Sequence, residues 1–257
     1  MIPGISSLTA NKKIYFASDF HLGAPSLKES REREFTIVKW LNQIEADAQA
    51  IFLLGDIFDF WFEYKYVVPK GFVRLLGKLA DLTDKGIHVV FFTGNHDMWM
   101  FDYFPQELNI PIYRQAQTIT INDKKILIGH GDGLGETGWS YKLLKKIFSS
   151  SICQWAFARI HPNFGFRIAH FWSKKSREGS SLSASDSPDP EKEWIFKYCQ
   201  KIEEQAHHDY YVFGHRHLTL DLEINQQSRY INIGEWMDQY TYGIFDGKTF
   251  KLLQFEK

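Results

Sequence analysis

The sequence has few cysteines, almost no net charge and no long apolar run. Its 257 residues include two cysteines, Cys153 and Cys199, which are far apart and outside any CxxC pattern. This spacing excludes a disulfide framework and a thiolate metal site, and it favours a reducing compartment. The net charge of −1 predicts neither nucleic-acid binding nor membrane attachment from overall charge.

Targeting and membrane-spanning signals are also missing from the sequence. No run of about 18 apolar residues exists, and residues 1–13 lack the apolar core and cleavage pattern of a secretory signal. We therefore expect a cytoplasmic protein. The hydrophobic content of 44% supports a sizeable core, and the length suits one large domain, with or without a substantial insertion.

Short apolar runs alternate with helical patterns along the first hundred residues. Strands are expected at residues 13–18, 50–54 and 87–92, with helices at 31–46 and 70–85 between them. A hairpin is expected at 118–128. Further strands are expected at 210–213, 218–224, 229–233, 241–245 and 250–255. This order predicts one layered α/β domain over residues 1–257.

The pattern changes between the hairpin and residue 209, where we expect a helical cap inserted at residues 133–208. Residues 139–177 are aromatic, basic and helix-like. Residues 178–190 are rich in Ser, Pro and Asp, which predicts a mobile loop. A helix is expected to return at 191–206, with Pro190 at its start.

Five polar motifs each follow an expected strand. They are Asp19-Phe20-His21, Gly55-Asp56-Ile57-Phe58-Asp59, Gly94-Asn95-His96-Asp97, Gly129-His130-Gly131-Asp132 and Gly214-His215-Arg216-His217. Ligands of layered α/β sheets bind at the carboxyl ends of strands, so these side chains are expected to converge. Glycine before four of the polar residues is expected to let the backbone turn sharply there.

The residue types in these motifs suit a pair of divalent metal ions. Carboxylate and amide oxygens with neutral imidazole nitrogens form mixed sites for manganese, iron, zinc or magnesium. Each motif alone has an ordinary explanation, and a single His130 is more often a core or surface histidine than a ligand. All five together are hard to explain by packing, because unpaired buried charges are costly.

These motifs resemble those of the calcineurin-like metallophosphoesterase superfamily over residues 13 to about 255. The resemblance implies a four-layer α/β/β/α sandwich with a helical cap, and two metal ions that activate a bridging water for attack at phosphorus. The implied ligands of the first metal are Asp19, His21, Asp56 and His217. The implied ligands of the second are Asp56, Asn95, His130 and His215, with Asp56 bridging.

The resemblance also implies supporting residues around the metals. His96 and Asp59 match the family's His–Asp pair, in which the imidazole lies near the leaving-group oxygen. Asp97 and Asp132 are expected to orient neighbouring loops or ligands. A non-catalytic scaffold with this fold would usually lack metal ligands, and none of the seven is missing here.

The core motifs do not select a substrate, so the cap must do so. Residues 139–177 contain eight Lys or Arg and no Asp or Glu, interleaved with aromatic residues. This composition suits an anionic amphiphile at a membrane interface. It also suits single-stranded nucleic acid, for a broad-specificity phosphodiesterase or nuclease. A plain helical cap with its own aromatic core is the third interpretation.

The segments SDFHLG, GDIFDFW and HGDGLG resemble the UDP-2,3-diacylglucosamine hydrolases of lipid A synthesis, as does the basic cap. Those enzymes split a pyrophosphate and release UMP and the lipid 1-phosphate, typically with manganese, which we favour here. The resemblance implies a nucleotide-linked glycolipid substrate rather than nucleic acid, and contact of the cap with the inner face of the cell membrane. Substrate contacts are expected at Tyr141, Lys142, Lys145 and Arg159, and acyl-chain contacts at Phe148, Ile152, Trp155 and Phe157.

One residue departs from this pattern. The best-known branch of those hydrolases has arginine after the asparagine, whereas this chain has His96 there. His96 restores the general superfamily motif. The alternatives are a divergent branch with the same substrate, or a cap that serves another phosphodiester or pyrophosphate.

Overall fold

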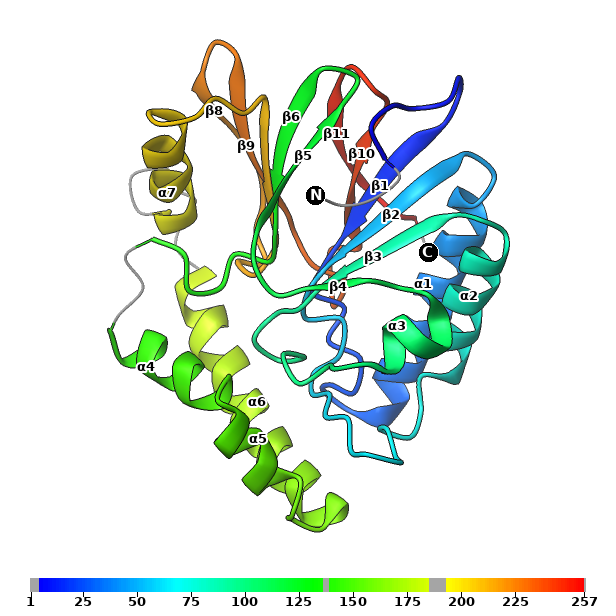
Figure 1. The fold of residues 1–257 in the computed structure, drawn as a ribbon, viewed down its shortest axis with the longest axis vertical. Helices are drawn as coiled ribbons and strands as arrows, with labels where there is room; N and C mark the ends of the chain where they lie inside the picture. The colour runs from blue at the N-terminus through cyan, green and yellow to red at the C-terminus, as the bar shows by residue number, and fades with distance from the viewer. Residues whose placement is uncertain (1–4, 136–138, 185–192, 257) are drawn as a thin grey trace.

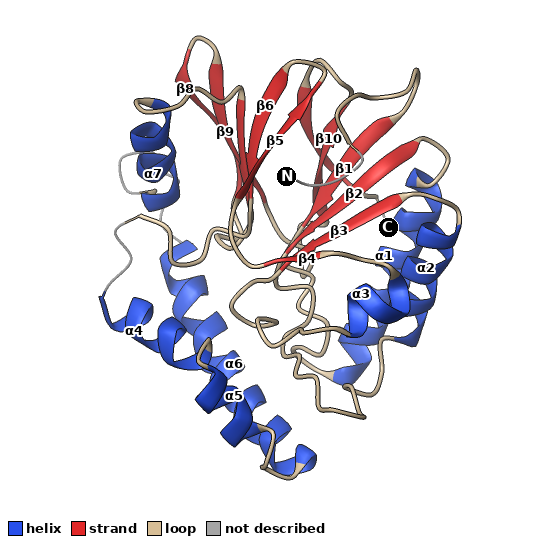
Figure 2. Cartoon of the chain, viewed as in Figure 1, coloured by secondary structure: helices blue, strands red, loops and turns tan. Residues whose placement is uncertain are grey.

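A computed structural model describes residues 5–135, 139–184 and 193–256 (Figure 1). Two β-sheets face each other at its centre, with helices on both outer sides (Figure 2). The six-stranded sheet has the order β11-β10-β1-β2-β3-β4, and the five-stranded sheet has the order β5-β6-β7-β9-β8.

The first sheet combines a parallel half with an antiparallel edge. Its strands are β1 (Lys13–Ala17), β2 (Ala48–Leu54), β3 (His88–Phe92), β4 (Ile112–Tyr113), β10 (Thr241–Phe245) and β11 (Phe250–Gln254). β1 to β4 run parallel, while β10 pairs antiparallel with both β1 and β11. The helices α1 (Leu27–Ile44), α2 (Val73–Asp84) and α3 (Tyr103–Leu108) lie on its outer side (Figure 1).

The second sheet contains the expected hairpin. Its strands are β5 (Gln117–Ile121), β6 (Lys124–Ile128), β7 (Tyr210–Phe213), β8 (Thr219–Asn225) and β9 (Ser228–Ile233). β6, β7 and β9 run parallel, and β5 and β8 are antiparallel edge strands. All the strands expected from the sequence are therefore present, with boundaries shifted by a few residues. The helix α3 and the two-residue strand β4 were not predicted from the sequence.

The alternation of side chains along the strands produces separate cores on the two faces of the first sheet. In β1, Ile14 and Phe16 pack between the two sheets, whereas Tyr15 and Ala17 pack against the helices. Successive side chains of a strand point to opposite faces, and all four are buried here. The continuous apolar runs of the sequence thus correspond to strands covered on both sides.

The last helix of the expected insertion, α7 (Trp194–Glu203), covers the outer face of the second sheet (Figure 1). Its Ile195, Phe196 and Cys199 pack with Tyr211 and Tyr230 of that sheet in a third apolar cluster. The arrangement is the α/β/β/α sandwich implied by the resemblance. Within the segment 133–208, α7 is therefore a layer of the sandwich, because its apolar side is buried on the sheet.

The remaining helices of that segment extend away from the sandwich (Figure 1). They are α4 (Trp139–Phe148), α5 (Ser151–Phe157) and α6 (Pro162–Ala184), and we call these three helices the cap. The expected loop at residues 178–190 is wrong in its first part, because α6 continues to Ala184. No proline occurs between Pro162 and Pro188, so each added residue can extend the helix by one hydrogen bond. Residues 185–190 lie outside the described ranges, and no helix within those ranges is long and apolar enough to cross a membrane.

Candidate active site

The five polar motifs meet at one edge of the sandwich. Each follows the carboxyl end of a strand: β1, β2 and β3 in the first sheet, and β6 and β7 in the second. Backbone hydrogen bonds join the loops, from Asp19 N to Gly55 O (3.0 Å), His21 N to Asp56 O (2.9 Å) and Gly214 N to His130 O (2.9 Å). The loops therefore form one connected layer in which the polar side chains have fixed positions.

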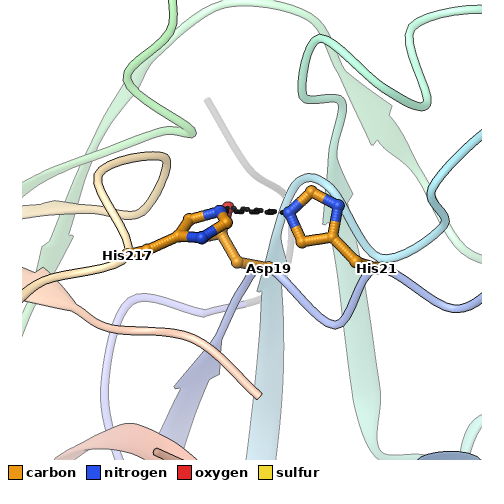
Figure 3. Close-up of side chains that lie close together, drawn as sticks. All are labelled: Asp19, His21 and His217. Atoms are coloured by element: carbon orange, nitrogen blue, oxygen red, sulfur yellow. Dashed lines mark hydrogen bonds and ion pairs between the residues drawn. The ribbon is translucent and has the colours of Figure 1, made fainter. Parts of the chain in front are cut away.

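Asp19, His21 and His217 form one side-chain cluster at this edge (Figure 3). The Nε2 atoms of His21 and His217 are 3.1 Å apart, and Asp19 Oδ1 lies 3.2 Å from His217 Nε2. Two atoms that bind one ion at about 2.1 Å lie roughly 3–3.5 Å apart. Two of the three spacings fit ligands of a common cation, and the third, between His21 Nε2 and Asp19 Oδ1, is longer at 3.8 Å.

Asp56, His130 and His215 form a second cluster beside the first. Asp56 Oδ2 is 3.3 Å from His130 Nε2 and 3.9 Å from His21 Nε2, so this carboxylate lies between the two clusters. His130 Nδ1 is 2.7 Å from the carbonyl oxygen of Leu54. Because a carbonyl only accepts, Nδ1 carries the proton and Nε2 is the nitrogen available to a metal.

Contacts of the neighbouring residues Gly94 and His96 place Asn95 at this edge. The backbone N–H of His96 donates to Asp56 Oδ1 over 2.9 Å. On the other side, a Cβ atom on Gly94 would lie only 2.7 Å from the backbone nitrogen of Asp56. Asn95 is therefore held between two residues that contact the loop of Asp56.

Several of these residues have a backbone conformation that is unfavourable for any residue other than glycine. The φ angles are +55° at Asp19, +43° at His21, +52° at Asp56, +70° at His215 and +53° at His217. Such left-handed residues cost on the order of 1–2 kcal/mol each and are concentrated at functional sites. Their number at one sheet edge indicates that the fold maintains this arrangement at the expense of stability.

The glycines of the motifs have two different roles. Gly55 has a φ of +88°, in agreement with the sharp turn expected from the sequence. Gly94 and Gly214 are instead required for close approach, since a Cβ atom on Gly214 would lie 2.6 Å from Asp19 Oδ2. A side chain at either position would displace a carboxylate of the site.

Burial and mutual charges shift the pKa values of Asp56 and of the histidines beside it. Burial alone would raise the pKa of Asp56, but nearby histidines, His130 first among them, hold that pKa well below its usual range. Burial likewise opposes protonation of His130, yet Asp56 raises its pKa above the ordinary value. The pKa of His215 falls to about 4 because of burial and the charge on His130. A bound divalent cation would replace the protons of such imidazoles.

The donor atoms of the clusters fit a metal centre. Among the described residues, nine buried side-chain atoms make no hydrogen bond, and Asp19 Oδ1, Asn95 Oδ1 and His130 Nε2 are three of them. Buried polar atoms are nearly always paired with protein, water or an ion. These three atoms lie on residues expected to be ligands, and they match the mixed oxygen and nitrogen set that divalent metals bind.

His96 lies next to these clusters with its side chain 6% exposed. Its Nδ1 is 3.0 Å from the carbonyl oxygen of Asp59 and 2.9 Å from the hydroxyl oxygen of Ser173. The Asp59 carboxylate is 3.8 Å from that nitrogen and 3.5 Å from His21 Nδ1. His96 and Asp59 are therefore adjacent, as expected, but the contact is made by the Asp59 backbone. Burial is the main cause of the lowered pKa of His96, about 4.

Asp97 and Asp132, which we expected to orient neighbouring loops or ligands, hold parts of the site together. Asp97 accepts hydrogen bonds from the backbone of Gly94 (2.7 Å) and Ile57 (2.8 Å), which joins two of the motif loops. Burial and the charge of Asp56 raise the pKa of Asp97 to about 7. Asp132 forms a 2.6 Å ion pair with Lys145 and thereby joins this edge of the sandwich to α4. We call the edge that carries the five motifs and the expected ligands the metal edge.

A mainly apolar cavity of about 440 Å³ lies between this edge and the cap. Asn95, His96 and Asp59 contribute its polar wall. Its apolar wall combines core and cap residues: Phe60, Trp61, Met98, Trp99, Leu144, Phe148, Phe157, Ala169 and Trp172. The cavity thus extends from the expected catalytic histidine into the cap.

The four expected substrate contacts divide into two groups. Tyr141 and Lys145 line the cavity, and the Tyr141 hydroxyl is 3.3 Å from Asp132. Lys142 does not line the cavity and donates to the carbonyl of Gly135 (2.9 Å). Arg159 also lies outside the cavity wall, with its guanidinium 4.8 Å from the ring centre of Trp155. Among the expected acyl-chain contacts, Phe148 and Phe157 line the cavity, whereas Ile152 is 78% and Trp155 60% exposed.

Sequence reasoning missed two cap residues at the site. Ser173 contacts His96, and His170 Nδ1 lies 3.8 Å from Asp59 Oδ2. Neither belongs to a motif, and the contact of Ser173 spans 77 positions of the chain. Only the docking of α6 against the loops could have identified them.

Comparisons with known proteins agree with this geometry. Residues 12–218 match the model of the family described as calcineurin-like phosphoesterase. A protein of Porphyromonas gingivalis named UDP-2,3-diacylglucosamine hydrolase is 35% identical over 95% of this chain and 98% of its own length. Two further proteins of the same name are also similar. The one from Histophilus somni is 25% identical over 88% of this chain and 92% of its own length. The one from Vibrio atlanticus is 27% identical over 93% of this chain and 96% of its own length. The family uses divalent metal ions, and the chain is a hydrolase that belongs to the calcineurin-like phosphoesterase family.

Proposed function

We propose that the chain hydrolyses the pyrophosphate of UDP-2,3-diacylglucosamine to UMP and 2,3-diacylglucosamine 1-phosphate, a step of lipid A biosynthesis. The observation that carries this proposal is the apolar cavity, which begins at Asn95 and His96 and extends into the cap. The lipid half of this substrate, with a phosphate at one end and acyl chains at the other, matches such a cavity. The names of the similar proteins support the same substrate.

Two divalent metal ions, with manganese favoured over iron, zinc and magnesium, would be held by the two clusters. Asp19, His21 and His217 would hold one ion, while Asn95, His130 and His215 would hold the other, and Asp56 would contact both. When bound, such a pair neutralises phosphate charge and activates water for attack at phosphorus. The position of Asp56 Oδ2 between His130 and His21 supports its shared role.

His96 would act on the phosphate that is cleaved. Its Nδ1 faces the carbonyl of Asp59, so Nε2 is the nitrogen available to the substrate. A phosphate beside Nε2 favours the protonated imidazole, which can donate to a phosphoryl or leaving-group oxygen. The carboxylate of Asp59 would orient the neighbouring imidazoles of His96 and His21 from its position 3.8 Å and 3.5 Å away.

The cap would bind the lipid part of the substrate. Phe148, Phe157 and Trp172 form an aromatic wall of the cavity, and Lys145 and Tyr141 lie between this wall and the metal edge. An ammonium group and a hydroxyl at this position suit the phosphate or sugar, while the aromatic wall suits acyl chains. Lys142 and Arg159 would contact the headgroups of the surrounding membrane.

The outer surface of the cap supports contact with a membrane. Trp139 is 78% exposed, Ile152 78%, Trp155 60% and Phe171 68%. Large apolar side chains interleaved with lysine and arginine suit the interface of an anionic bilayer. We propose that the cap, a part of one domain spanning residues 1–257, rests on the inner face of the cell membrane and receives the lipid substrate there.

The direct test is release of UMP by the purified protein with Mn²⁺ and UDP-2,3-diacylglucosamine. We expect metal-dependent release that stops on chelation and returns when Mn²⁺ is restored. Cleavage of a generic phosphodiester under the same conditions, without release of UMP, would contradict the proposed substrate while leaving the reaction class intact.

A broad-specificity phosphodiesterase or nuclease is the second candidate. The exposed pair of Arg159 and Trp155 favours it, because stacked cations and rings bind single-stranded nucleic acid. Such binding would weaken steeply with salt. Absence of binding to single strands even at low ionic strength excludes this candidate.

A further inference from the structure

Ser173 of α6 is a cap residue in contact with the proposed catalytic histidine. Its hydroxyl oxygen lies 2.9 Å from His96 Nδ1 and 3.0 Å from the carbonyl oxygen of Asp59. His96 Nδ1 is itself 3.0 Å from that carbonyl, so the three atoms form a closed triangle. Two of them belong to the sandwich and one to the cap.

The burial of Ser173 differs from that of its neighbours on α6. Ser173 is 6% exposed, whereas Phe171 and Trp172 are 68% and 50% exposed. At this position the helix thus buries a polar side chain beside two more exposed aromatic residues, whereas a helix usually buries its apolar side chains. A buried hydroxyl is costly unless it makes hydrogen bonds, and two partners of this one are groups of the site.

Close contacts fix α6 against the loop that contains Asp59. A Cβ atom on Gly165 would lie 3.1 Å from the Phe157 ring and 3.2 Å from the Tyr64 hydroxyl, so glycine allows tight packing there. The Phe166 ring packs edge-on against Phe60, with ring centres 5.0 Å apart. The N-terminal half of α6 is therefore docked against the segment that follows Asp59.

The chemistry of the three atoms assigns their hydrogens. A carbonyl oxygen only accepts, whereas a serine hydroxyl donates one hydrogen and accepts others. The Ser173 O–H therefore donates to Asp59, and the Ser173 oxygen faces the Nδ1–H of His96. This arrangement favours the tautomer of His96 that carries its proton on Nδ1 and leaves Nε2 for the substrate.

We propose that Ser173 is a positioning residue for His96, through which docking of the cap orients the catalytic imidazole. The proposal rests on the role of His96 in the proposed function. It assigns the cap a part in the chemical step as well as in substrate binding. An open cap would remove the hydroxyl from the triangle and leave the imidazole less restrained.

The kinetic test compares Ser173→Ala with Ser173→Thr and with the matched control Ser151→Ala. Ser151 is exposed at the start of α5, away from the cavity wall. Loss of one neutral hydrogen bond in the transition state corresponds to a decrease of about 10-fold in kcat. We expect this decrease for Ser173→Ala with KM nearly unchanged, recovery to within about 3-fold for Ser173→Thr, and wild-type values for Ser151→Ala.

Two outcomes of that comparison would overturn the proposal. One is a Ser173→Ala variant that is as active as Ser151→Ala. The other is a decrease that appears in KM alone, which would make Ser173 a residue of substrate binding or cap structure. Thermal unfolding of each variant establishes that the compared proteins are folded.

A spectroscopic test separates this proposal from the proposed substrate. Long-range ¹H–¹⁵N spectra of the protein without substrate report the tautomer of each imidazole, and His96→Gln identifies the signals of His96. We expect the Nδ1–H form in every variant, because the carbonyl of Asp59 still accepts from Nδ1, and a change in the His96 ring signals of Ser173→Ala that Ser173→Thr does not show. Ring signals of His96 in Ser173→Ala that equal those of the wild type refute the positioning role, whereas failure to release UMP refutes only the proposed function.

Discussion

At the strand ends, Asp19, His21 and Asp56 are at most 2% exposed, whereas across the cavity the cap leaves Trp139 and Ile152 78% exposed. The loops of the metal edge are joined by backbone hydrogen bonds between motifs, while much of the surface of the cap has no covering layer among the described residues. Both regions are rich in functional side chains, but they differ in how firmly these are held.

This difference indicates a division of roles. Metal-binding side chains must keep their positions when no metal is bound. Of the proposed ligands, Asp19, Asp56 and His215 have left-handed backbones, so the fold maintains their positions against local strain. The cap needs only an apolar wall of suitable size, which tolerates many residues of similar volume. We therefore expect changes at the metal edge to abolish the reaction, and changes in the cap to alter the substrate.

The largest effect is expected for Asp56→Asn, which keeps the size of the side chain and removes its charge. Both metal positions should lose affinity, so kcat/KM should fall by at least about 10³-fold. Metal content and UMP release measure the two losses. Asp123→Asn, in the exposed turn of the hairpin, is the matched control and should behave as wild type. Unchanged turnover in Asp56→Asn would refute the site.

His96→Gln should reduce kcat by about 10²- to 10³-fold, in the range of general acid–base catalysis. Its metal content should remain that of the wild type, since His96 is not among the proposed ligands. His88→Gln, at an exposed position of β3, is the control. A loss of metal as complete as in Asp56→Asn would instead make His96 a ligand, together with His21 and Asp59, whose donor atoms also lie close together.

Ala169→Trp tests the cap side of the comparison. Ala169 is 6% exposed in the cavity wall, so a large side chain there should fill space needed by an acyl chain. We expect kcat/KM for the diacylated substrate to fall by about 10- to 100-fold, as two or three lost methylene contacts would produce. Hydrolysis of a short, water-soluble phosphodiester should be unaffected.

Ala156→Trp, at an exposed position of α5, is the control for added bulk in the cap. If Ala169→Trp reduced the hydrolysis of both substrates equally, the cavity would not be a selective lipid site. The division of roles between the metal edge and the cap would then be wrong.

The smallest effect on activity is expected for Glu203→Gln, which lies at the end of α7, outside both regions. Burial would raise the pKa of Glu203, but hydrogen bonds from His207, His208, Tyr211 and Ser228 outweigh it and lower the pKa to about 2. Because the folded pKa lies below the unfolded value of about 4.3, this stabilisation is present above the unfolded pKa and is lost as the pH falls towards 2.

Glu203→Gln should therefore lower the free energy of unfolding by about 1–2 kcal/mol at pH 7, with turnover unchanged. Its difference from wild type should shrink between about pH 4.3 and pH 2, as measured by denaturant unfolding. A difference that is constant over this range would show that the charge of Glu203 contributes nothing.

Most of the fold could be predicted because its central strands are covered on both faces. Such strands appear as short apolar runs, as in β2 and β3, and motifs follow directly where the runs end. Boundaries in the cap were harder to predict, because Ser and Gly within residues 178–184 weaken a helix without ending it. The short α3 and β4 have too few residues to show the periodic spacing of apolar residues that identifies a helix or a strand.

The site could be predicted in part for a similar reason. Parallel strands end at one edge, so the sequence was sufficient to predict that the loops of Asp19, Asp56 and His130 meet there. The opposite side of the cavity depends on how α6 docks against the loops, and the pattern of apolar residues in the sequence does not predict this docking. Ser173 was missed on these grounds, and Arg159 was expected at the substrate although it stacks on Trp155 outside the cavity.

We propose above all that the strand ends hold two metal ions that share Asp56. A crystal structure of the protein grown with Mn²⁺, with anomalous diffraction to locate the ions, tests it most directly. We expect two anomalous peaks, one among Asp19, His21, Asp56 and His217, the other among Asp56, Asn95, His130 and His215. A single peak, or a peak among His21, Asp59 and His96, would contradict the account.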